Sequence, residues 1–273
     1  LRDFQTAAWI LDHCFKIKSH SDITNSNIFN TNEFKQLVDA HNFIKLLRYA
    51  INLIQTNSRN RLSFNSQIEL AKKANIKISK AKQPVEKLMQ LYYSNAEKLS
   101  IFNETIFDLY EEKNPLRVKR DYGEFFIKNN RIGLKNEDLK NNKHLIFKIF
   151  IKLGQRKDIT NIDTRTSKIL RENILLIDKD FKNDINFSKQ FLEILRSPYN
   201  LSSILKKMKR LGIIQAYIKE FKEVIGQMQF DLFHVYTVDE HTFKVVRNMR
   251  QMKINHIDEG FEIETELINR LPK

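Results

Sequence analysis

The stretch PVEKLMQLYYSNAEKLSIFNETIFDL, residues 84 to 109, carries the clearest fold signal in the chain. Its apolar residues recur every three or four positions, which places them on one face of a long amphipathic helix. Pro84 stands at the start, where a proline in the first turn loses no intrahelical hydrogen bond. The predicted apolar face is made of Val85, Leu88, Met89, Tyr92, Ala96, Leu99, Phe102, Ile106 and Leu109.

Three segments that precede this helix show the same periodicity and predict its partners. Residues 4–18 form one amphipathic stripe, and residues 67–75 form a shorter one. Between them we expect a helix of about six turns after an Asn32 N-cap, with Glu33 in its first turn. His41 lies on the stripe of that helix and is expected to be a core or boundary residue. The four helices predict a helical bundle over residues 1–115.

The pattern changes at Asn114–Pro115. The sequence GEFFIKNNRIGL, residues 123–134, has two short β-prone runs around Asn129–Asn130. Asparagine tolerates the left-handed conformation that tight hairpin turns need. We therefore expect one small β-hairpin near residues 124–134, inside a bridging segment of residues 116–186 whose later part is helical. One of its helices should end at Gly154 as a C-terminal cap. The predicted fold class is mainly α, with a domain boundary near residues 182–187.

Composition supports a helical protein inside the cell. The 273 residues include only six Gly and four Pro, and long helices with few turns explain that scarcity. No apolar run reaches the about 18 residues that a membrane span needs, and the N-terminal residues lack the features of a secretory signal. A single cysteine, Cys14, cannot form an internal disulfide. We expect a cytoplasmic protein without a membrane partner.

The net charge of +14 invites a nucleic-acid hypothesis, because basic surfaces attract phosphates. The lysines, however, are spread along the whole chain, and no block of five or six like charges appears. We interpret the charge as a solvated, lysine-rich surface at exposed helical positions, and we expect no nucleic-acid partner.

One histidine is singled out by its local pattern. Thr237 to Glu240 has the spacing of a capping box, which fixes the start of a helix. His241, Val245 and Met249 then fall on one helical face, and we expect that face to point into the protein. An inward imidazole needs a hydrogen-bond partner or a metal, so His241 is either a core residue or a ligand, and the spacing alone favours the core residue. His234, in a predicted loop, is more ambiguous.

The run from Gly226 to Thr242, GQMQFDLFHVYTVDEHT, closely resembles the start of the HD phosphohydrolase domain in bifunctional PII uridylyltransferase/uridylyl-removing enzymes. The resemblance extends over the chain. Leu1-Arg2-Asp3 looks like the end of the element that closes that family's nucleotidyltransferase domain. Other segments are similar to its helical region and to the approach to its HD domain, at residues 59–76, 84–93, 191–198 and 211–221.

The resemblance implies a fold and a function. Residues 187–273 would be the first helices of an HD-type all-α domain. The parent enzyme would transfer UMP from UTP to the regulatory protein PII when glutamine is low, and remove it when glutamine is high. In such domains Mg or Mn lowers the pKa of a bound water for hydrolysis. His241 takes the place of the first metal ligand, whereas Asp3 and His234 are weaker catalytic candidates, and a helix-dipole role is favoured for Asp3.

Parts of the family's machinery are missing. The sequence has no His-Asp dipeptide for the remaining metal ligands and no Gly-rich turn for a triphosphate. We expect an internal segment of a longer enzyme that alone carries out neither reaction. Three alternatives remain: a related glutamine synthetase adenylyltransferase, which should lack the His-bearing HD signature, a non-catalytic helical interaction module, and a helical scaffold in which His241 merely packs.

Overall fold

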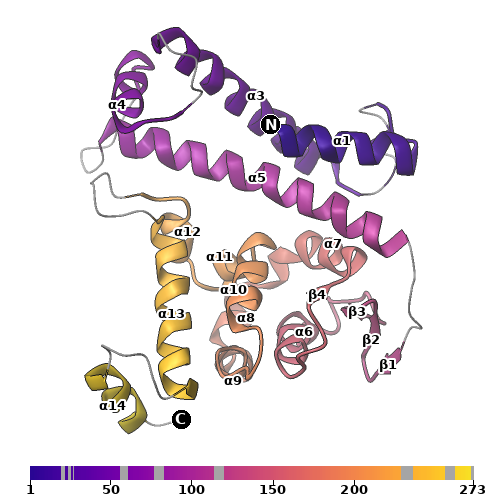
Figure 1. Cartoon of the computed structure of the whole chain (residues 1–273). Coiled ribbons are helices and arrows are strands. Elements are labelled where there is room, and N and C mark those ends of the chain that lie inside the picture. Colours follow the sequence, from indigo (N-terminus) through magenta and orange to yellow (C-terminus); the bar gives the residue numbers. More distant parts are fainter. Residues whose placement is uncertain are drawn as a thin grey trace.

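The structure is a computed structural model that describes residues 1–19, 22–23, 26, 28–55, 61–76, 83–113, 120–228, 236–255 and 262–271. Its longest element is α5 (Pro84–Lys113), the helix predicted from the periodicity of residues 84–109. Figure 1 shows α5 crossing the molecule, with the N-terminal helices on one side and the remaining elements on the other. The mainly α fold is confirmed.

The N-terminal helices pack on α5 and form the predicted bundle. They are α1 (Arg2–Phe15), α3 (Thr31–Ile54) and α4 (Phe64–Lys73). The N-cap of α3 is Asn30 and not Asn32: the Asn30 side chain accepts from the Glu33 N–H, and the Glu33 carboxylate accepts from the Asn30 N–H. A capping box joins the N-cap to the third helical residue, so with Glu33 as the partner the helix begins two residues earlier than predicted. His41 is half-buried and stacks on Phe4, with 4.4 Å between ring centroids.

The predicted hairpin is present, but it is only half of a small sheet. Strands β2 (Phe125–Lys128) and β3 (Arg131–Leu134) pair antiparallel, and the turn residues Asn129 and Asn130 have φ of 50° and 60°. Two further strands extend the sheet in the order β1-β2-β3-β4: β1 (Arg120–Tyr122) is antiparallel to β2, and β4 (Asn161–Ile162) is parallel to β3. The expectation of a single hairpin was therefore wrong in extent, because strands of two or three residues carry no readable alternation.

Most of the remaining helices surround one hydrophobic core that runs from Phe125 to Phe243 in the sequence. The core includes residues on both sides of position 187, and the predicted division there stays a prediction. Bounds of these elements are α6 (Leu145–Gly154), α7 (Thr164–Glu172), a 3-10 turn (Ile174–Leu176), α8 (Lys179–Asn183), α9 (Ile185–Leu195), α10 (Leu201–Arg210), α11 (Ile213–Tyr217), α12 (Phe221–Val224), α13 (Val238–Asn255) and α14 (Glu262–Arg270).

Gly154 ends α6 for a reason other than the predicted cap. It is the last helical residue, and the cap residue after it is Gln155 in a right-handed conformation. A Cβ at position 154 would lie 2.2 Å from the Ser197 Oγ. The glycine therefore allows the end of α6 to approach the segment that follows α9.

A buried arginine attaches the sheet to α5. The Arg131 guanidinium, from β3, lies 2.9 Å from Asp108 and 2.5 Å from Glu111, both on α5. Burial raises the pKa of Asp108, although Lys207 and Arg131 oppose the rise. Because buried charges persist only when they are paired, these contacts fix the sheet against the long helix.

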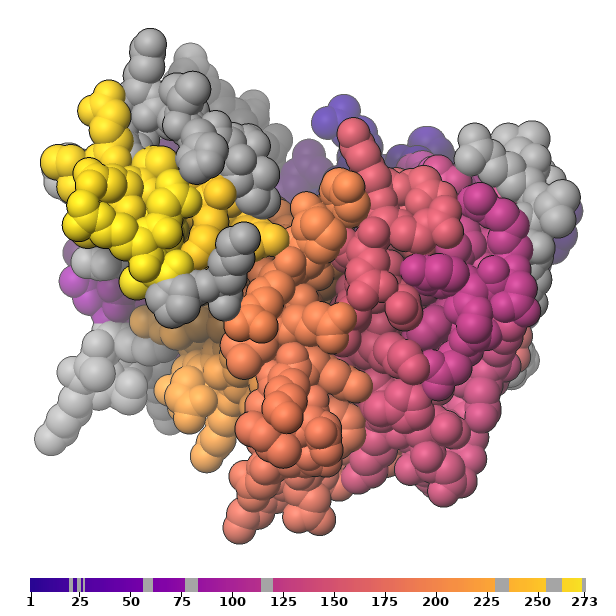
Figure 2. All heavy atoms as spheres, turned by 90° about the horizontal axis from the view of Figure 1, so that it is seen from below, coloured from indigo at the N-terminus to yellow at the C-terminus, as the bar shows by residue number. Residues whose placement is uncertain are grey.

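Helices α13 and α14 extend from one side of the molecule. Figure 2 shows the C-terminal residues in yellow on that side, and the sheet region, in magenta and pink, on the opposite side. In the part of the chain that the structure describes, none of the helices combines the length and the apolar character that crossing a bilayer requires.

Candidate functional site

Of the three candidate residues, the structure describes Asp3 and His241, which lie on different helices. Asp3 is exposed in the first turn of α1, where its carboxylate complements the positive end of the helix, as its favoured alternative role predicts. His234 lies outside the described residues. His241 lies in the first turn of α13, and its N–H donates to the Thr237 carbonyl at 2.8 Å. Of the two described candidates, only His241 belongs to the stretch 226–242 that resembles the HD signature.

The His241 face of α13 is exposed, which corrects the expectation that it points inward. His241 is exposed, and Val245 and Met249 on the same face are 42% and 47% exposed. The face that packs into the protein carries Asp239 and Phe243, which are 2% and 3% exposed. The spacing of His241, Val245 and Met249 therefore indicated the wrong face, and the face that packs is the one whose Asp239 carboxylate pairs with a buried lysine.

A buried lysine holds the start of α13. Lys209, on α10, is 6% exposed, and its Nζ lies 2.7 Å from Asp239 Oδ2. The same Nζ lies 2.9 Å from Glu97 Oε1 on α5 and 3.2 Å from Glu240 Oε1 on α13. One ammonium thus joins three carboxylates from two helices, and α10, α5 and α13 meet at this point. We call Lys209, Glu97, Asp239 and Glu240 the Lys209 cluster.

The electrostatics of the cluster favour a charged lysine. Burial alone would lower the pKa of Lys209, but the hydrogen bond to Asp239 and the hydrogen bond and charge of Glu97 raise it above its ordinary value. The three donors of an ammonium match the three carboxylate oxygens around it. Lys209 is therefore charged at neutral pH, and each of its three N–H donors has a carboxylate partner.

Backbone contacts complete the anchor. Gly226 has φ of 64°, and its N–H donates to Asp239 Oδ1 at 3.1 Å. The Val238 N–H donates to the Gln227 carbonyl at 2.8 Å, and Gln90 Nε2 on α5 donates to the Ile225 carbonyl at 3.3 Å. Both described ends of the stretch 226–242 are thus held against α5 and α10, and His241 projects from a fixed helix start.

The described residues supply one candidate metal ligand at this place and not a complete set. No group of three or more His, Cys, Asp or Glu side chains within them is arranged to hold a metal ion. Asp239 and Glu240 lie close in sequence, but their carboxylates face Lys209. What the geometry provides at His241 is an exposed imidazole on a rigid helix.

Sequence reasoning missed the Lys209 cluster. Lys209 belongs to the run KKMKR and was interpreted, with the other lysines, as part of the solvated surface. Asp239 was treated only as the interior of a capping box. A usable signal was the position of Lys209 directly after Met208, on the apolar side of α10. Asp178 and Asp180 have the Asp-x-Asp spacing that the resembled family uses to bind metal in its transferase half, but Asp178 caps α8 and pairs with Lys143.

Comparisons with known proteins identify the family. Residues 1–107 match the family model described as GlnD PII-uridylyltransferase, and residues 125–217 match the one described as Uridylyltransferase GlnD third domain. The chain belongs to the GlnD uridylyltransferase family. Residues 108–124 and 218–273, the latter with His241, lie outside these two matches.

Those relatives align with the whole chain. The bifunctional uridylyltransferase/uridylyl-removing enzymes of Pseudomonas aeruginosa and Nitrosococcus oceani are 29% and 30% identical to it over 279 aligned positions, covering 100% of this chain and 31% of theirs. That of Pseudomonas fluorescens is 28% identical over the same share. The chain thus spans about a third of the length of the relatives it matches. No solved structure shows a significant match.

The exposure of His241 leads to a first prediction about this family member. His241→Ala in the 273-residue chain should change the free energy of unfolding by no more than about 0.5 kcal/mol, because the side chain packs against no core. Urea denaturation of both proteins measures this difference. A loss of 2 kcal/mol or more would show that His241 is a packing residue, as the scaffold alternative holds.

Proposed function

We propose that this chain is part of an enzyme that transfers UMP from UTP to the regulatory protein PII and also hydrolyses the resulting UMP ester. The observation that carries the proposal is the alignment of the whole chain with bifunctional uridylyltransferase/uridylyl-removing enzymes, together with two GlnD family matches. The names of these relatives contain both activities. Glutamine would favour removal, and its shortage would favour transfer, in a cytoplasmic enzyme.

Within that enzyme, we infer that the chain connects the transferase and hydrolase halves. The arrangement supports this role, because α5 contacts the N-terminal helices along one side and reaches the Lys209 cluster through Glu97. The same cluster holds α13, which carries His241. A displacement of α5 would therefore be transmitted directly to the start of α13.

His241 is the residue that we assign to the hydrolytic half. Its imidazole is exposed and does not pack against the core. The first turn of its helix is held by the ion pair between Asp239 and Lys209. Other residues of the parent enzyme would add the remaining ligands for Mg or Mn. The metal, when bound, would supply an activated water for phosphodiester hydrolysis. Of the chain's own residues, the Lys209 cluster would orient the His241 helix.

The test uses the full-length parent protein, purified PII, labelled UTP and Mg or Mn. Without glutamine, label should pass from UTP to PII. After addition of glutamine, the same enzyme should release UMP from the labelled PII. Failure of both reactions would overturn the proposal and favour the non-catalytic interaction module. Transfer of AMP from ATP to glutamine synthetase would instead favour the adenylyltransferase alternative.

A further inference from the structure

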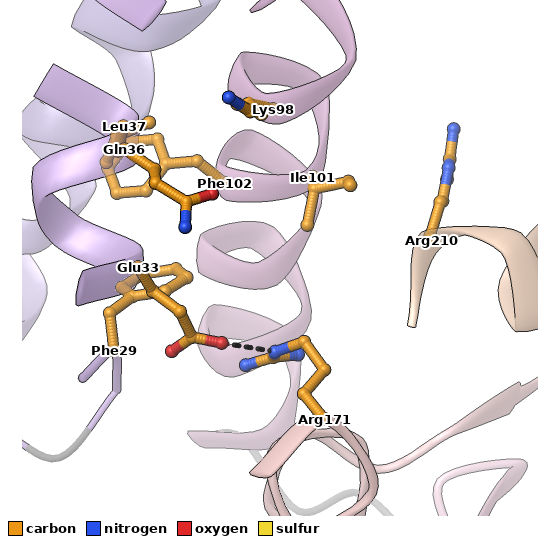
Figure 3. A pocket seen from close by; sticks show the side chains of 9 residues that line it. All are labelled: Phe29, Glu33, Gln36, Leu37, Lys98, Ile101, Phe102, Arg171 and Arg210. Carbon is orange, nitrogen blue, oxygen red and sulfur yellow. Dashed lines mark hydrogen bonds and ion pairs between the residues drawn. The ribbon is translucent and has the colours of Figure 1, made fainter. Parts of the chain in front are cut away.

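The arginines that line the cavity between α3, α5, α7 and α10 are already paired. The cavity measures about 170 Å³, and Figure 3 shows the ion pair between two of its lining residues, Arg171 and Glu33. Arg210, which lies apart from Arg171 in that view, pairs with Glu104. Positive charge that an anionic substrate could meet is present instead on the exposed side of α13, next to His241.

The exposed side of α13 has an apolar flank and a cationic flank, with His241 between them. Val245 and Met249, on the apolar flank, are 42% and 47% exposed. Lys244 lies on the other flank, because positions three and four residues after His241 fall on opposite sides of it around the helix. Positions i and i+3 are surface neighbours, with about 5–6 Å between their Cβ atoms. An apolar flank suits contact with other protein segments, whereas the cationic flank suits an anion beside His241.

Tyr236 holds the end of the Lys244 side chain near the start of α13. Lys244 Nζ lies 3.3 Å from the centroid of the Tyr236 ring, which is a cation–π contact. Tyr236 stands two residues before Val238, the first residue of the helix, and His241 lies in the first turn after it. Long helical side chains lean toward the N-terminus of their helix, so Lys244 reaches back along the turn that contains His241. The contact therefore keeps an ammonium beside the exposed imidazole.

The carboxylates at the start of α13 are engaged by other lysines. Asp239 lies 2.7 Å from Lys209 Nζ. Glu240 lies 3.2 Å from the Nζ atoms of Lys206 and Lys209. Within the described ranges, Lys244 makes no ion pair with a carboxylate. Its positive charge, left without a carboxylate in that part of the chain, remains available to a ligand.

We propose that Lys244 binds the phosphodiester group whose hydrolysis releases UMP from PII. This assignment rests on the proposed function, which places His241 in the hydrolytic half of the enzyme. Lys244 Nζ donates to a nonbridging oxygen of the phosphodiester, and the ring of Tyr236 positions that donor. A single ammonium matches the single negative charge of a phosphodiester, and charge-assisted contacts of this kind are stronger than neutral hydrogen bonds.

The contact stabilises charge during the reaction. The oxygen of water forms a bond to phosphorus, and the bond from phosphorus to the PII oxygen breaks. The PII oxygen takes up a proton from the water, which leaves UMP and unmodified PII. A donor aimed at the nonbridging oxygens in the transition state lowers the barrier to this step.

Lys244→Met in the full-length parent enzyme should lower the kcat for hydrolysis of UMP-PII by about 10–100-fold, because a charge-assisted hydrogen bond to the reacting phosphate is lost. KM should change less, since the contact strengthens in the transition state. Lys244→Arg should retain most of the rate, because a guanidinium also donates to phosphate oxygens. Transfer of UMP to PII should keep its rate in both variants.

Lys189→Met is the matched control. Lys189 is an exposed lysine on α9 and makes no ion pair with any carboxylate that the structure describes. Its substitution removes the same charge from a helix outside the stretch 226–242, so both reactions should be unaffected. Equal rates of hydrolysis for Lys244→Met and Lys189→Met would overturn the assignment.

Binding of UMP-PII without divalent metal gives a second readout, separate from turnover. In the presence of a chelator, the Lys244→Met parent enzyme should bind UMP-PII roughly five- to tenfold more weakly than the unchanged enzyme. Its affinity for unmodified PII should not change, because that protein has no phosphodiester. Equal weakening of both complexes would mean that Lys244 supports the interface and not the phosphodiester.

The same measurements separate this assignment from the proposed function. If the unchanged enzyme hydrolyses UMP-PII and Lys244→Met hydrolyses it equally fast, only the role of Lys244 is wrong. If the unchanged enzyme does not hydrolyse UMP-PII, the proposed function fails and the assignment of Lys244 fails with it.

Discussion

Lys209→Met should lower the free energy of unfolding of this chain by about 3–5 kcal/mol, the usual cost of removing one partner from a buried ion pair. Lys209 is 6% exposed, and Asp239, its nearest partner, is 2% exposed. Without the ammonium, the Asp239 carboxylate would stay buried with only the Gly226 N–H as a hydrogen-bond donor among the contacts described. Two further carboxylates, Glu97 and Glu240, would lose the charge between them. Urea denaturation gives the difference.

Lys206→Met is the control for this prediction. Lys206 lies on the same helix and pairs with Glu240 at 3.2 Å, but its side chain is 45% exposed. Exposed ion pairs contribute about 1 kcal/mol or less, so this variant should be nearly as stable as the unchanged chain. In addition, Lys209→Met with Asp239→Asn should be less destabilised than the sum of the single variants, since the unpaired charge is removed. Equal losses for Lys206→Met and Lys209→Met would contradict the assignment of Lys209 as the anchor of α13.

The long helices were predictable because their information is local. In α5 the spacing of apolar residues and the position of Pro84 define a helix start and a buried face without reference to the rest of the chain. The hairpin turn at Asn129–Asn130 is local too, because both residues adopt the left-handed conformation that asparagine tolerates. Such elements could be placed to within a few residues from the sequence.

Contacts between distant segments were not predictable in the same way. Strand β4 has two residues, so neither its length nor its composition predicts a strand. It pairs with β3, which lies some thirty positions earlier in the sequence. In the sequence, Lys209 cannot be distinguished from a surface lysine. Its burial depends on Asp239 and Glu97, which two other helices bring to it in the folded chain. A single sequence contains the charges of this cluster but not their pairing.

The candidate site contains one feature that the sequence predicted and one that it did not. His241 was selected by its resemblance to an HD signature, and the structure places it at the start of a helix as the capping pattern predicts. The direction of its side chain was wrong, since periodicity alone did not distinguish the His241 face from the Asp239 face. The face was decided by the ionic partner on α10.

His241→Ala in the full-length parent enzyme should reduce the hydrolysis of UMP-PII by at least about 100-fold. Changes to residues that only support a metal ligand already cost about 10–100-fold, and loss of a direct ligand should cost no less. Transfer of UMP from UTP should be unchanged, because the proposed function assigns that reaction to the other half of the parent enzyme. His13→Ala provides the control, since His13 is an exposed histidine on α1, distant in sequence from the stretch 226–242. Both reactions should be unaffected in that variant.

The most direct measurement is the ratio of the two activities in one preparation of the His241→Ala parent enzyme, with its melting temperature recorded alongside. The account predicts that hydrolysis of UMP-PII falls by at least about 100-fold, that transfer to PII keeps its rate, and that the melting temperature does not change. Equal losses of both activities, or full retention of hydrolysis, would contradict the assignment of His241 to the hydrolytic metal site.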